Sequence, residues 1–336
     1  MKILGIETSA DETGVCLIDA GGTFESGFHF DVLGVALASQ IEFHRQYGGI
    51  FPNVAKREHA KALVPLLQEV LRQADMLTAV STYTDISAYM TIVDSILTRE
   101  PELLVTIEEF AREFKRPEVD CIAVTVGPGL EPALWVGINF ARALAELWSV
   151  PIVAVNHMEG HLIMPMMEAG EKREFEFPLL GLLISGGHTE IILSKEFGTY
   201  ERIGETRDDA AGEAFDKVAR LLDLPYPGGP EISRLAAEAR AANMESGFTL
   251  PRPMMREDNF DFSFSGLKTA VLRLVQQHAP LTDDHKRMLA REFEDAVAEV
   301  LVEKVLRAAE QFGAQTILLG GGVSANERIK ERLMNR

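Results

Sequence analysis

The sequence ILGIETSADETGVCLI at residues 3–18 recurs in altered form as LLGLLISGGHTEIILS at residues 179–194. At a constant offset of 176 positions, Leu4, Gly5 and Leu17 face identical residues in the second copy. Ser9 and Thr13 also recur there, as Ser185 and Thr189. In both copies two apolar runs flank a short polar turn, a pattern that predicts a strand, a tight turn and a second strand.

A second match follows the first in the same order. Val124, Gly127 and Gly129 face Ile317, Gly320 and Gly322 at an offset of 193. Each copy predicts a strand, a glycine-rich loop and a helix. Because two ordered matches share nearly the same offset, we predict two homologous domains, residues 1–155 and residues 156–336.

Elsewhere in the chain, short runs rich in Val, Ile and Leu alternate with segments of helical periodicity, which favours an α/β fold. Strands are expected at 3–6, 15–18, 121–126, 152–155, 179–184, 190–193 and 316–319. Helices are expected at 54–73, 139–148, 211–222 and 288–312. Residues 75–115 contain few glycines or prolines and predict a helical insertion in the first domain.

The repeat also indicates a difference between its halves. In the first half the glycine loop precedes a helix and then a strand at 152–155, whereas the helix after Gly322 continues to Arg336. We therefore expect the second domain to lack its C-terminal strand and helix, either through truncation or as a departure from the repeat.

Composition and charge limit the function. The 336 residues are 46% hydrophobic and 25% charged, the mixture usual for a soluble globular protein. The net charge of −18 is unusual, and so acidic a surface excludes a protein that binds phosphate backbones through its overall field. Local positive charge remains at Lys56, Arg57 and Lys61. The sequence predicts a cytoplasmic protein without membrane attachment. Its two cysteines are expected to be reduced core residues, and it shows no signal-like or membrane-spanning apolar stretch.

His157 and His161 stand four residues apart, so on a helix they share one face and suit a divalent metal. A tight site needs a third protein ligand. Surface or capping histidines are the alternative. In zinc proteases a glutamate adjoins the first histidine, but Glu159 points away from that face and cannot serve as the base.

Two glycine-rich segments predict anion sites. Residues 183–189 follow a strand and expose successive backbone N–H groups, and residues 320–326 place glycines before a helix N-terminus. Plain turns are the alternative for either segment alone. Two such loops in repeated domains favour nucleotide binding.

Carboxylates gather in two places. Asp11 and Glu12 lie in the first hairpin turn, and a second cluster from Asp208 to Asp216 begins a helix, where the helix dipole alone favours acids. Asp216 lies too far inside for capping and is a candidate to bind ribose hydroxyls. Residues 226–230 predict a turn in which Gly229 lets a ligand approach the backbone. Phe262 and Phe264 are explained at least as well by core packing as by substrate contact.

Together these motifs closely resemble the tRNA threonylcarbamoyladenosine-forming transferases, the Kae1/TsaD family once labelled glycoproteases. The resemblance covers nearly the whole chain except the insertion near 75–115. It is carried by residues 5–9 and 11–14, 156–161, 185–189, 208–217, 262–269 and 320–326.

The resemblance implies a duplicated actin-like, Hsp70-like ATPase fold of the RNase H-like class. It implies transfer of a threonylcarbamoyl group from its adenylate, threonylcarbamoyl-AMP, to N6 of adenosine 37 in tRNAs that read codons beginning with A. His157 and His161 would bind one divalent metal, Fe²⁺ first, with Zn²⁺ or Mg²⁺ as alternatives. The adenylate would be bound by Leu183, Ile184, Ser185, Gly186, Gly187, Asp216, Gly229 and Asn326. An actin-like paralogue and a P-loop ATPase are the accessory proteins it implies.

The chemistry is an acyl-type transfer to a weakly nucleophilic amine, so catalysis should depend on positioning and on stabilising charge at the carbonyl oxygen. Asp11 or Glu12 is our candidate to relay the proton of the amine. This sequence departs from the family in two places. Family members usually carry a third metal ligand, an aspartate, beyond the glycine-rich helix, and the given sequence stops before that position. Ala10 stands where many bacterial relatives carry a cysteine.

Three other functions compete with this one. A catalytically weak, actin-like nucleotide-binding scaffold that docks partners is the main alternative, whereas the position of Glu159 disfavours a metalloprotease. A sugar kinase of the same fold has no need of His157 and His161. Because of the acidic charge, we expect tRNA binding by the chain alone to be weak and strongly salt-sensitive, with partners supplying much of the phosphate contact.

Overall fold

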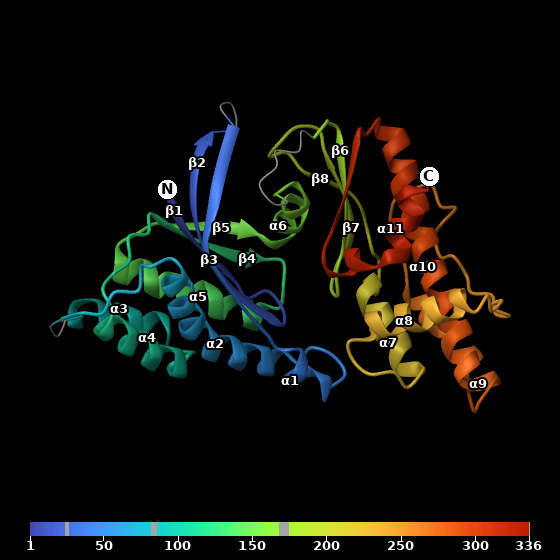
Figure 1. Cartoon of the computed structure of the whole chain (residues 1–336), viewed down its shortest axis with the longest axis horizontal. Helices are drawn as coiled ribbons and strands as arrows, with labels where there is room; N and C mark the ends of the chain where they lie inside the picture. The colour runs from blue at the N-terminus through green and yellow to red at the C-terminus, as the bar shows by residue number, and fades with distance from the viewer. Residues whose placement is uncertain (24–26, 82–85, 168–174, 336) are drawn as a thin grey trace. The chain divides into compact units, whose positions relative to one another are not determined.

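The computed structural model describes residues 1–23, 27–81, 86–167 and 175–335. The chain divides into two compact units, Met1–His157 and Met158–Arg336 (Figure 1). The domain boundary expected from the sequence lies two residues before this division.

The first unit is built on a five-stranded sheet with the order β3-β2-β1-β4-β5. Strands β1 (Lys2–Glu7), β2 (Glu12–Thr23) and β3 (Gly27–Ser39) form an antiparallel meander. Strands β4 (Cys121–Gly127) and β5 (Ile152–Asn156) join β1 in parallel. A parallel pair needs a crossover, and α5 (Glu131–Trp148) supplies it.

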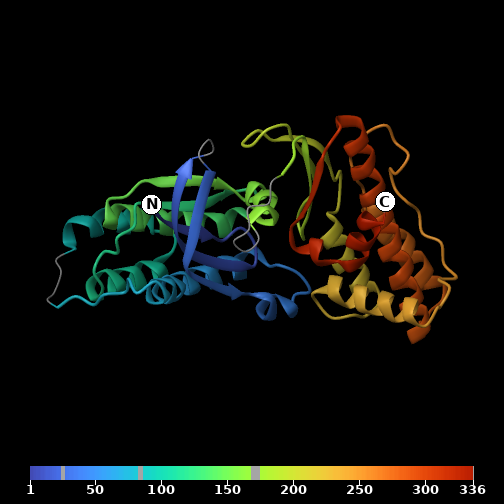
Figure 2. The same cartoon turned by 45° about the horizontal axis from the view of Figure 1, so that its top comes forward.

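Helices cover one face of this sheet. Figures 1 and 2 show α2 (Pro52–Gln73) and α5 on the same side of it. Leu4, Ile6 and Leu17 point from the sheet into the core that these helices close. Helices α3 (Ser87–Ile96) and α4 (Pro101–Glu113) pack beside them, so the predicted insertion is helical in its described part. The short α1 (Ile41–Arg45) leads from β3 into α2.

The second unit repeats the same sheet pattern in the order β8-β7-β6-β9. Its strands are β6 (Leu179–Ile184), β7 (Thr189–Ser194), β8 (Glu201–Glu205) and β9 (Thr316–Gly320). Leu180 pairs with Leu193 as Leu4 pairs with Leu17, which confirms the offset of 176 residue by residue.

The second predicted offset is wrong by two residues. Leu4 of β1 pairs with Ile122, and its equivalent Leu180 pairs with Ile317, so Ile122 rather than Val124 corresponds to Ile317. Counted from Ile122 and Ile317, strand β4 therefore ends two residues later than strand β9. Alternation of side chains survives because the difference is an even number.

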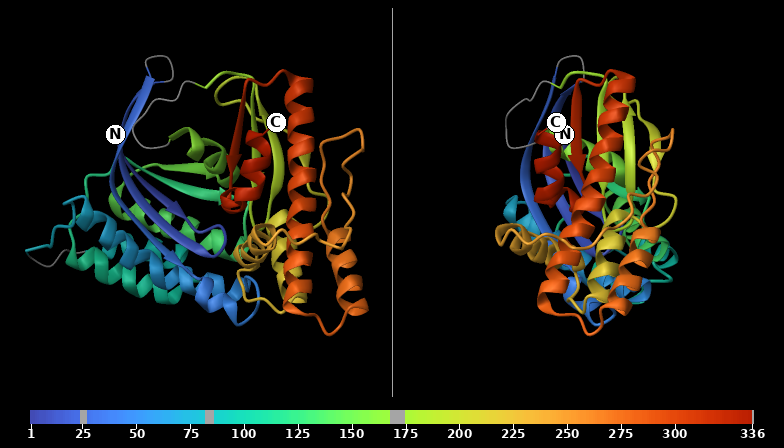
Figure 3. Two further views of the ribbon diagram at one scale, coloured as in Figure 1. Left: turned by 45° about the vertical axis from the view of Figure 1, so that its right-hand side comes forward. Right: turned by 90° about the vertical axis from the view of Figure 1, so that its right-hand side faces the viewer.

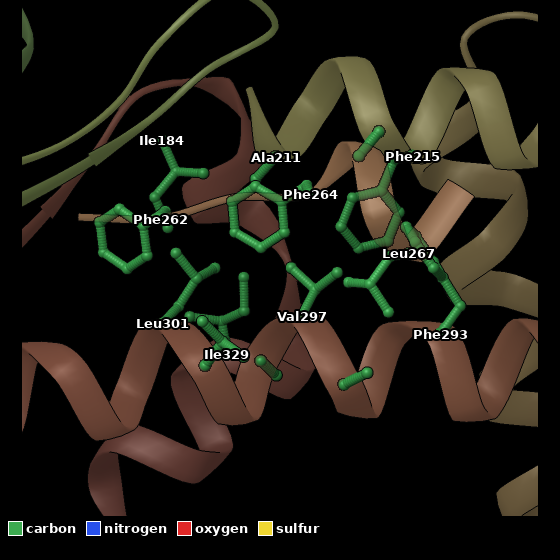
Figure 4. Close-up of a cluster of buried hydrophobic side chains, with 14 of the residues drawn as sticks. Ile184, Ala211, Phe215, Phe262, Phe264, Leu267, Phe293, Val297, Leu301 and Ile329 are labelled. Carbon is green, nitrogen blue, oxygen red and sulfur yellow. The ribbon is translucent and has the colours of Figure 1, made fainter. Parts of the chain in front are cut away.

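A large apolar core lies on one face of the second sheet. Helix α10 (Asp283–Phe312) runs alongside the strands in both views of Figure 3. Its Phe293, Val297 and Leu301 pack with the buried Phe262 and Phe264, as Figure 4 shows. The core-packing interpretation of these two phenylalanines is therefore confirmed. Helices α7 (Ala211–Leu221), α8 (Gly228–Ala241), α9 (Ser265–Gln277) and α11 (Glu327–Met334) complete the unit.

The opposite face of β6 is covered by α6 (His157–Ile163) and the 3₁₀ turn η1 (Met164–Met167) that follows it. Met158 and Leu162 of α6 contact Leu179 and Leu183 of β6. Both faces of β6 are therefore buried, and this explains its uninterrupted apolar sequence.

Several elements differ from the sequence prediction. Strands β3 and β8 and helix α9 were not predicted, and residues 226–230 are not a simple turn, because α8 begins at Gly228. The turn prediction failed because the glycine pair was taken as a chain reversal, whereas Pro227 leads directly into the helix as its N-cap. No helix in the described ranges is long and apolar enough to cross a membrane.

Candidate functional site

A pocket of about 590 Å³ lies entirely within the second unit. It is lined by the start of α7, by the length of α8, by Glu294 of α10, and by η2 (Gly322–Ala325) with the start of α11. Four of the predicted adenylate-binding residues line it: Gly186, Asp216, Gly229 and Asn326. These residues come from four separate segments, and folding brings them to one cavity of a size usual for small-molecule sites.

Three glycines on the pocket wall have no structural reason to be glycine. A Cβ atom built on Gly186, Gly229 or Gly322 would meet nothing within 4 Å. None of the three has the positive φ that favours glycine. Their missing side chains leave backbone exposed to the cavity, which suits a phosphate-bearing ligand.

The neighbouring glycines are different, because the fold requires them. A Cβ on Gly212 would lie 2.6 Å from the carbonyl oxygen of Ser185, and one on Gly228 would lie 2.8 Å from the Cα of Asp216. Gly321 has φ +86° and would clash with the backbone of Ile184. These residues let the loops pack closely enough to form the pocket.

Asp216 lies on α7 at the pocket and has a partner in the protein. Its Oδ1 accepts a hydrogen bond of 2.7 Å from the backbone N–H of Gly228. The carboxylate thereby stabilises the positive N-terminus of α8 and keeps Gly229 beside the cavity. As predicted, Asp216 does not cap its own helix. It does bind the N-terminus of the neighbouring helix α8, and the sequence prediction missed this.

Asn326 is held by three hydrogen bonds. Its Oδ1 accepts from the N–H of Ile329 at 3.0 Å and caps α11. Its Nδ2 donates to Ser233 Oγ at 3.0 Å and to Glu294 Oε1 at 2.8 Å. The cap and the carboxylate fix which end of the amide is oxygen, so the side chain has a single orientation at the pocket.

Below Asn326 the pocket is supported by a buried ion network. Arg240 donates to Glu294 at 2.6 Å and to Asp295 at 3.0 Å, and Arg328 donates to Asp295 at 2.7 Å. These charges come from α8, α10 and α11. No sequence pattern indicated the network, because its members lie up to 88 positions apart and only folding joins them.

The other predicted ligand residues lie around the rim or in the core. The side chains of Leu183 and Ile184 are buried in apolar clusters and do not line the pocket, so only their backbone is available to a ligand. Ser185 Oγ accepts from the N–H of His188 at 3.0 Å and shapes the turn. A Cβ on Gly187 would also meet nothing within 4 Å.

The acidic segment 208–216 is largely explained by structure. Asp208 accepts hydrogen bonds from the backbone N–H groups of Phe264 and Ser265 at 2.8 and 3.1 Å, so it holds the start of α9. Burial raises the pKa of Asp208, but these bonds and those from Ser263 and Ser265 hydroxyls lower it below its usual value. Asp209 pairs with Lys217 at 2.7 Å.

The first unit presents Asp11 and Glu12 at the turn between β1 and β2. Burial raises the pKa of Asp11, and burial together with the charges of Asp11 and Glu7 raises that of Glu12. A carboxylate with a raised pKa is a better proton acceptor at neutral pH. The turn therefore carries two groups suited to proton transfer.

Two histidines that the sequence did not single out fix this turn. His59 Nε2 lies 3.0 Å from the carbonyl oxygen of Ala10, and its Nδ1 lies 2.7 Å from Thr13 Oγ1. Because a carbonyl accepts only, Nε2 carries the proton and Nδ1 accepts from Thr13. Burial lowers the pKa of His59, so the ring is neutral and holds the turn through these two hydrogen bonds. The other, His44, bonds Gln40 and the backbone of Phe51.

Glu7 is a further residue that sequence reasoning missed. Its carboxylate accepts from Ser9 N–H and Thr125 Oγ1, both at 2.5 Å, and lies 3.4 Å from His157 Nδ1. Burial raises the pKa of Glu7, but hydrogen bonds from His157, Ser9 and Thr125 outweigh it and lower the pKa to about 2. Glu7 is thus an ionised partner for the ring of His157.

The two predicted metal ligands lie one turn apart on α6, as the spacing requires. Glu159 interacts with Tyr200, where its charge and a hydrogen bond add to burial in raising the pKa of the phenol. Within the part of the chain that is described, no group of three His, Cys, Asp or Glu residues could hold a metal ion. Two imidazoles alone do not fit a tight metal site.

The chain has an actin-like ATPase-type fold. Its two α/β units repeat one sheet pattern, and the second unit contains a pocket beside the N-termini of α8 and α11. Among solved structures, HypF of T. kodakarensis has the same fold, with 13% identity, coverage of 99% of this chain and 43% of its own, and a TM-score of 0.52. Component A of the (R)-2-hydroxyglutaryl-CoA dehydratase of Acidaminococcus fermentans covers 100% of this chain and 88% of its own, with 11% identity and a TM-score of 0.48.

The sequence comparisons give the family. The family model described as TsaD, tRNA N6-adenosine threonylcarbamoyltransferase, matches residues 31–82 and 101–336. A protein of that name from Ralstonia pickettii (strain 12J) is 44% identical over 338 residues, which cover 99% of this chain and 82% of the relative. The chain belongs to the tRNA N6-adenosine threonylcarbamoyltransferase family. The predicted fold and the prediction of a transferase are confirmed.

Proposed function

We propose that this protein transfers a threonylcarbamoyl group from threonylcarbamoyl-AMP to N6 of adenosine 37 in tRNA. The observation that carries the proposal is the pocket of the second unit, whose glycines leave backbone bare without any packing reason. Together with membership of the family, it supports an adenylate as the ligand.

Different residues of the pocket suit different parts of the adenylate. The N–H groups around Gly186 and Gly322 suit the phosphate, and the carboxylate of Asp216 suits ribose hydroxyls. Asn326 contributes an oriented amide toward the nucleoside. Leu183, Ile184, Ser185 and Gly187 belong to this proposal through backbone and rim contacts alone.

The reaction needs little covalent help from the protein. The N6 amine attacks the carbamoyl carbonyl carbon, a new C–N bond forms, and the bond between that carbon and the phosphate oxygen of AMP breaks. The amine must lose a proton, and Asp11 or Glu12 accepts it in this proposal. Because AMP is a stable leaving group, positioning and charge stabilisation supply most of the acceleration.

A direct test is single-turnover transfer of labelled threonylcarbamoyl from its adenylate to tRNA. Wild-type protein should label tRNA with adenosine at position 37 and leave tRNA with inosine there unlabelled, because inosine has no N6 amine. Absence of label in wild-type reactions that contain the accessory proteins would refute the proposed transfer.

Replacing each acid by its amide tests the proton relay. We expect Asp11→Asn or Glu12→Gln to slow transfer about 100-fold or more, the usual contribution of general base catalysis. Asp31→Asn, an exposed acid on β3, is the matched control and should transfer at the wild-type rate. Unchanged rates in both amide variants would remove these acids from the mechanism.

The remaining assignments stay predictions. Metal binding by His157 and His161 is tested by measuring the Fe²⁺ and Zn²⁺ content of the purified protein and of a His157→Ala variant. The accessory actin-like paralogue and P-loop ATPase follow from the family resemblance and are tested by co-purification. The cytoplasmic location is predicted from the sequence composition and is tested by fractionation.

A further inference from the structure

Three aromatic side chains stand exposed on the first unit between β3 and α2. Phe43, Tyr47 and Phe51 are 46%, 49% and 47% exposed, and we call them the aromatic platform. The rings of Tyr47 and Phe51 stack with centroids 5.2 Å apart and planes inclined by 21°. The packing of the unit does not explain so much exposed aromatic surface in one short segment.

The platform is tied to the acidic turn by consecutive hydrogen bonds. The N–H of Gln40 donates to the carbonyl oxygen of Asp11 at 2.8 Å. Gln40 Oε1 lies 3.1 Å from His44 Nε2, and the N–H of Phe51 donates to His44 Nδ1 at 3.3 Å. Nδ1 therefore accepts and Nε2 donates, so the ring is neutral, and burial lowers its pKa.

These ties are internal, because Gln40 and His44 are almost completely buried. Fixing a surface loop through a buried amide and a buried imidazole keeps it in one position relative to Asp11 and Glu12. An aromatic surface that merely filled space would need no such connection to the turn that carries the reactive groups.

Cations are also present in this part of the chain. Arg45 follows Phe43 in α1, and Arg57 and Lys61 lie on α2 after Phe51; all three are exposed and form ion pairs with Glu42 or Glu58. These cations stand out in a chain that carries −18. Exposed aromatic rings among cations are typical of surfaces that bind single-stranded nucleic acid.

We propose that the aromatic platform stacks unpaired bases of the anticodon loop beside the adenosine to be modified, with Arg57 and its neighbours at the adjacent phosphates. The inference rests on the proposed function, which it deepens by naming the surface that holds the RNA. A folded loop offers splayed bases that can stack on aromatic rings, whereas a paired stem does not.

Binding of an anticodon stem-loop RNA to the full chain with its accessory proteins tests the proposal. Tyr47→Ala and Phe51→Leu should each weaken binding about 5- to 150-fold, the range of one lost base stack. The dependence of affinity on salt should stay unchanged, because no phosphate contact is lost. Arg57→Gln should instead reduce the salt slope by about one.

The controls separate stacking from general damage. Tyr89→Ala removes an aromatic ring of similar exposure from α3 and should bind like wild type. Tyr47→Phe keeps the ring and should retain affinity. The fluorescence of 2-aminopurine placed in the loop should be quenched by wild type and restored in Tyr47→Ala, a signal that a purely structural role would not give.

The outcomes are distinct. Equal affinity and equal quenching for wild type, Tyr47→Ala and Phe51→Leu overturn the platform. So does a loss of accessory-protein binding with unchanged RNA affinity, which would make the platform a protein-docking surface. If wild type itself fails to bind the loop, the tRNA step of the proposed function fails, whatever the variants do.

Discussion

At the scale of single residues, the glycines of the second unit are of two kinds, for which alanine substitution should have different effects. Gly186 and Gly229 border the pocket and have open space where a Cβ atom would stand, whereas Gly212 is pressed against the backbone of Ser185. In the proposed function the first kind leaves room for the ligand, whereas packing requires the second kind.

Alanine substitution should therefore separate binding from stability. Gly186→Ala and Gly229→Ala should fold normally and lose at least about tenfold in AMP affinity, measured by calorimetry, because the new methyl group enters the ligand space. Gly212→Ala should lower the unfolding free energy by about 1–3 kcal/mol, since it must move backbone.

A matched control is available on α9. Gly266 also has open space around it but does not line the pocket, so Gly266→Ala should keep both AMP affinity and stability. Normal AMP binding by both Gly186→Ala and Gly229→Ala would place the ligand elsewhere.

Lys304 is a buried cation whose ammonium donates to three oxygens, those of Asn259 O, Asn259 Oδ1 and Asp261 O. Burial lowers its pKa from 10.5 to about 8. The folded state therefore releases this proton at lower pH than the unfolded state does. Between about pH 8 and 10.5 the unfolded chain binds more protons, so the contribution of Lys304 to stability rises with pH.

The prediction compares wild type with Lys304→Met, which has no proton to lose there. The unfolding free energy of wild type should increase relative to the variant by up to about 3 kcal/mol between pH 8 and 10.5. Below pH 8 the difference should be constant. Denaturant titrations at several pH values measure it, and a flat difference across the whole range would contradict a lowered pKa.

At the scale of elements, α10 supports the second unit and its ends are well defined. Thr282 accepts from the N–H of His285 at 3.2 Å in a capping box, and Gly313 ends the helix with φ 63°. Thr282→Ala should cost about 1 kcal/mol of unfolding free energy, while Thr282→Ser keeps the cap and should cost less. Equal losses for the two variants would show that the hydroxyl does not cap the helix.

Sequence reasoning succeeded where an element has a strong internal pattern. The strands of the repeat were predicted from short runs rich in Val, Ile and Leu, and helices α2, α7 and α10 were predicted from their helical periodicity. Strand β3 was missed because its exposed face carries Val32, Val35 and Leu37, so polar and apolar residues do not alternate.

The site was predictable only in part. Glycines and histidines in short motifs could be found by spacing, and four of the predicted ligand residues do share one pocket. Glu7, His59 and the Arg240–Glu294 pair could not be found, since each acts through a partner distant in sequence. Only the folded chain shows which distant charges meet.

At the scale of the whole molecule, the charge of −18 makes salt dependence informative. We expect the chain alone to bind tRNA weakly, with affinity that falls steeply as salt rises, and accessory proteins to increase both the affinity and the slope. Filter binding between low and physiological salt measures both quantities. Tight binding by the isolated chain at physiological salt would contradict this expectation.

The extra two residues of β4 have a consequence for the two glycine loops. They carry the first glycine loop about 6–7 Å further along its strand. There Gly129 lies against the backbone of Ser9 and Leu130 donates to its carbonyl oxygen at 2.7 Å, whereas Gly322 in the second unit opens onto the pocket. The first glycine loop is therefore filled by the hairpin of its own unit, and the two units present unlike surfaces at corresponding loops.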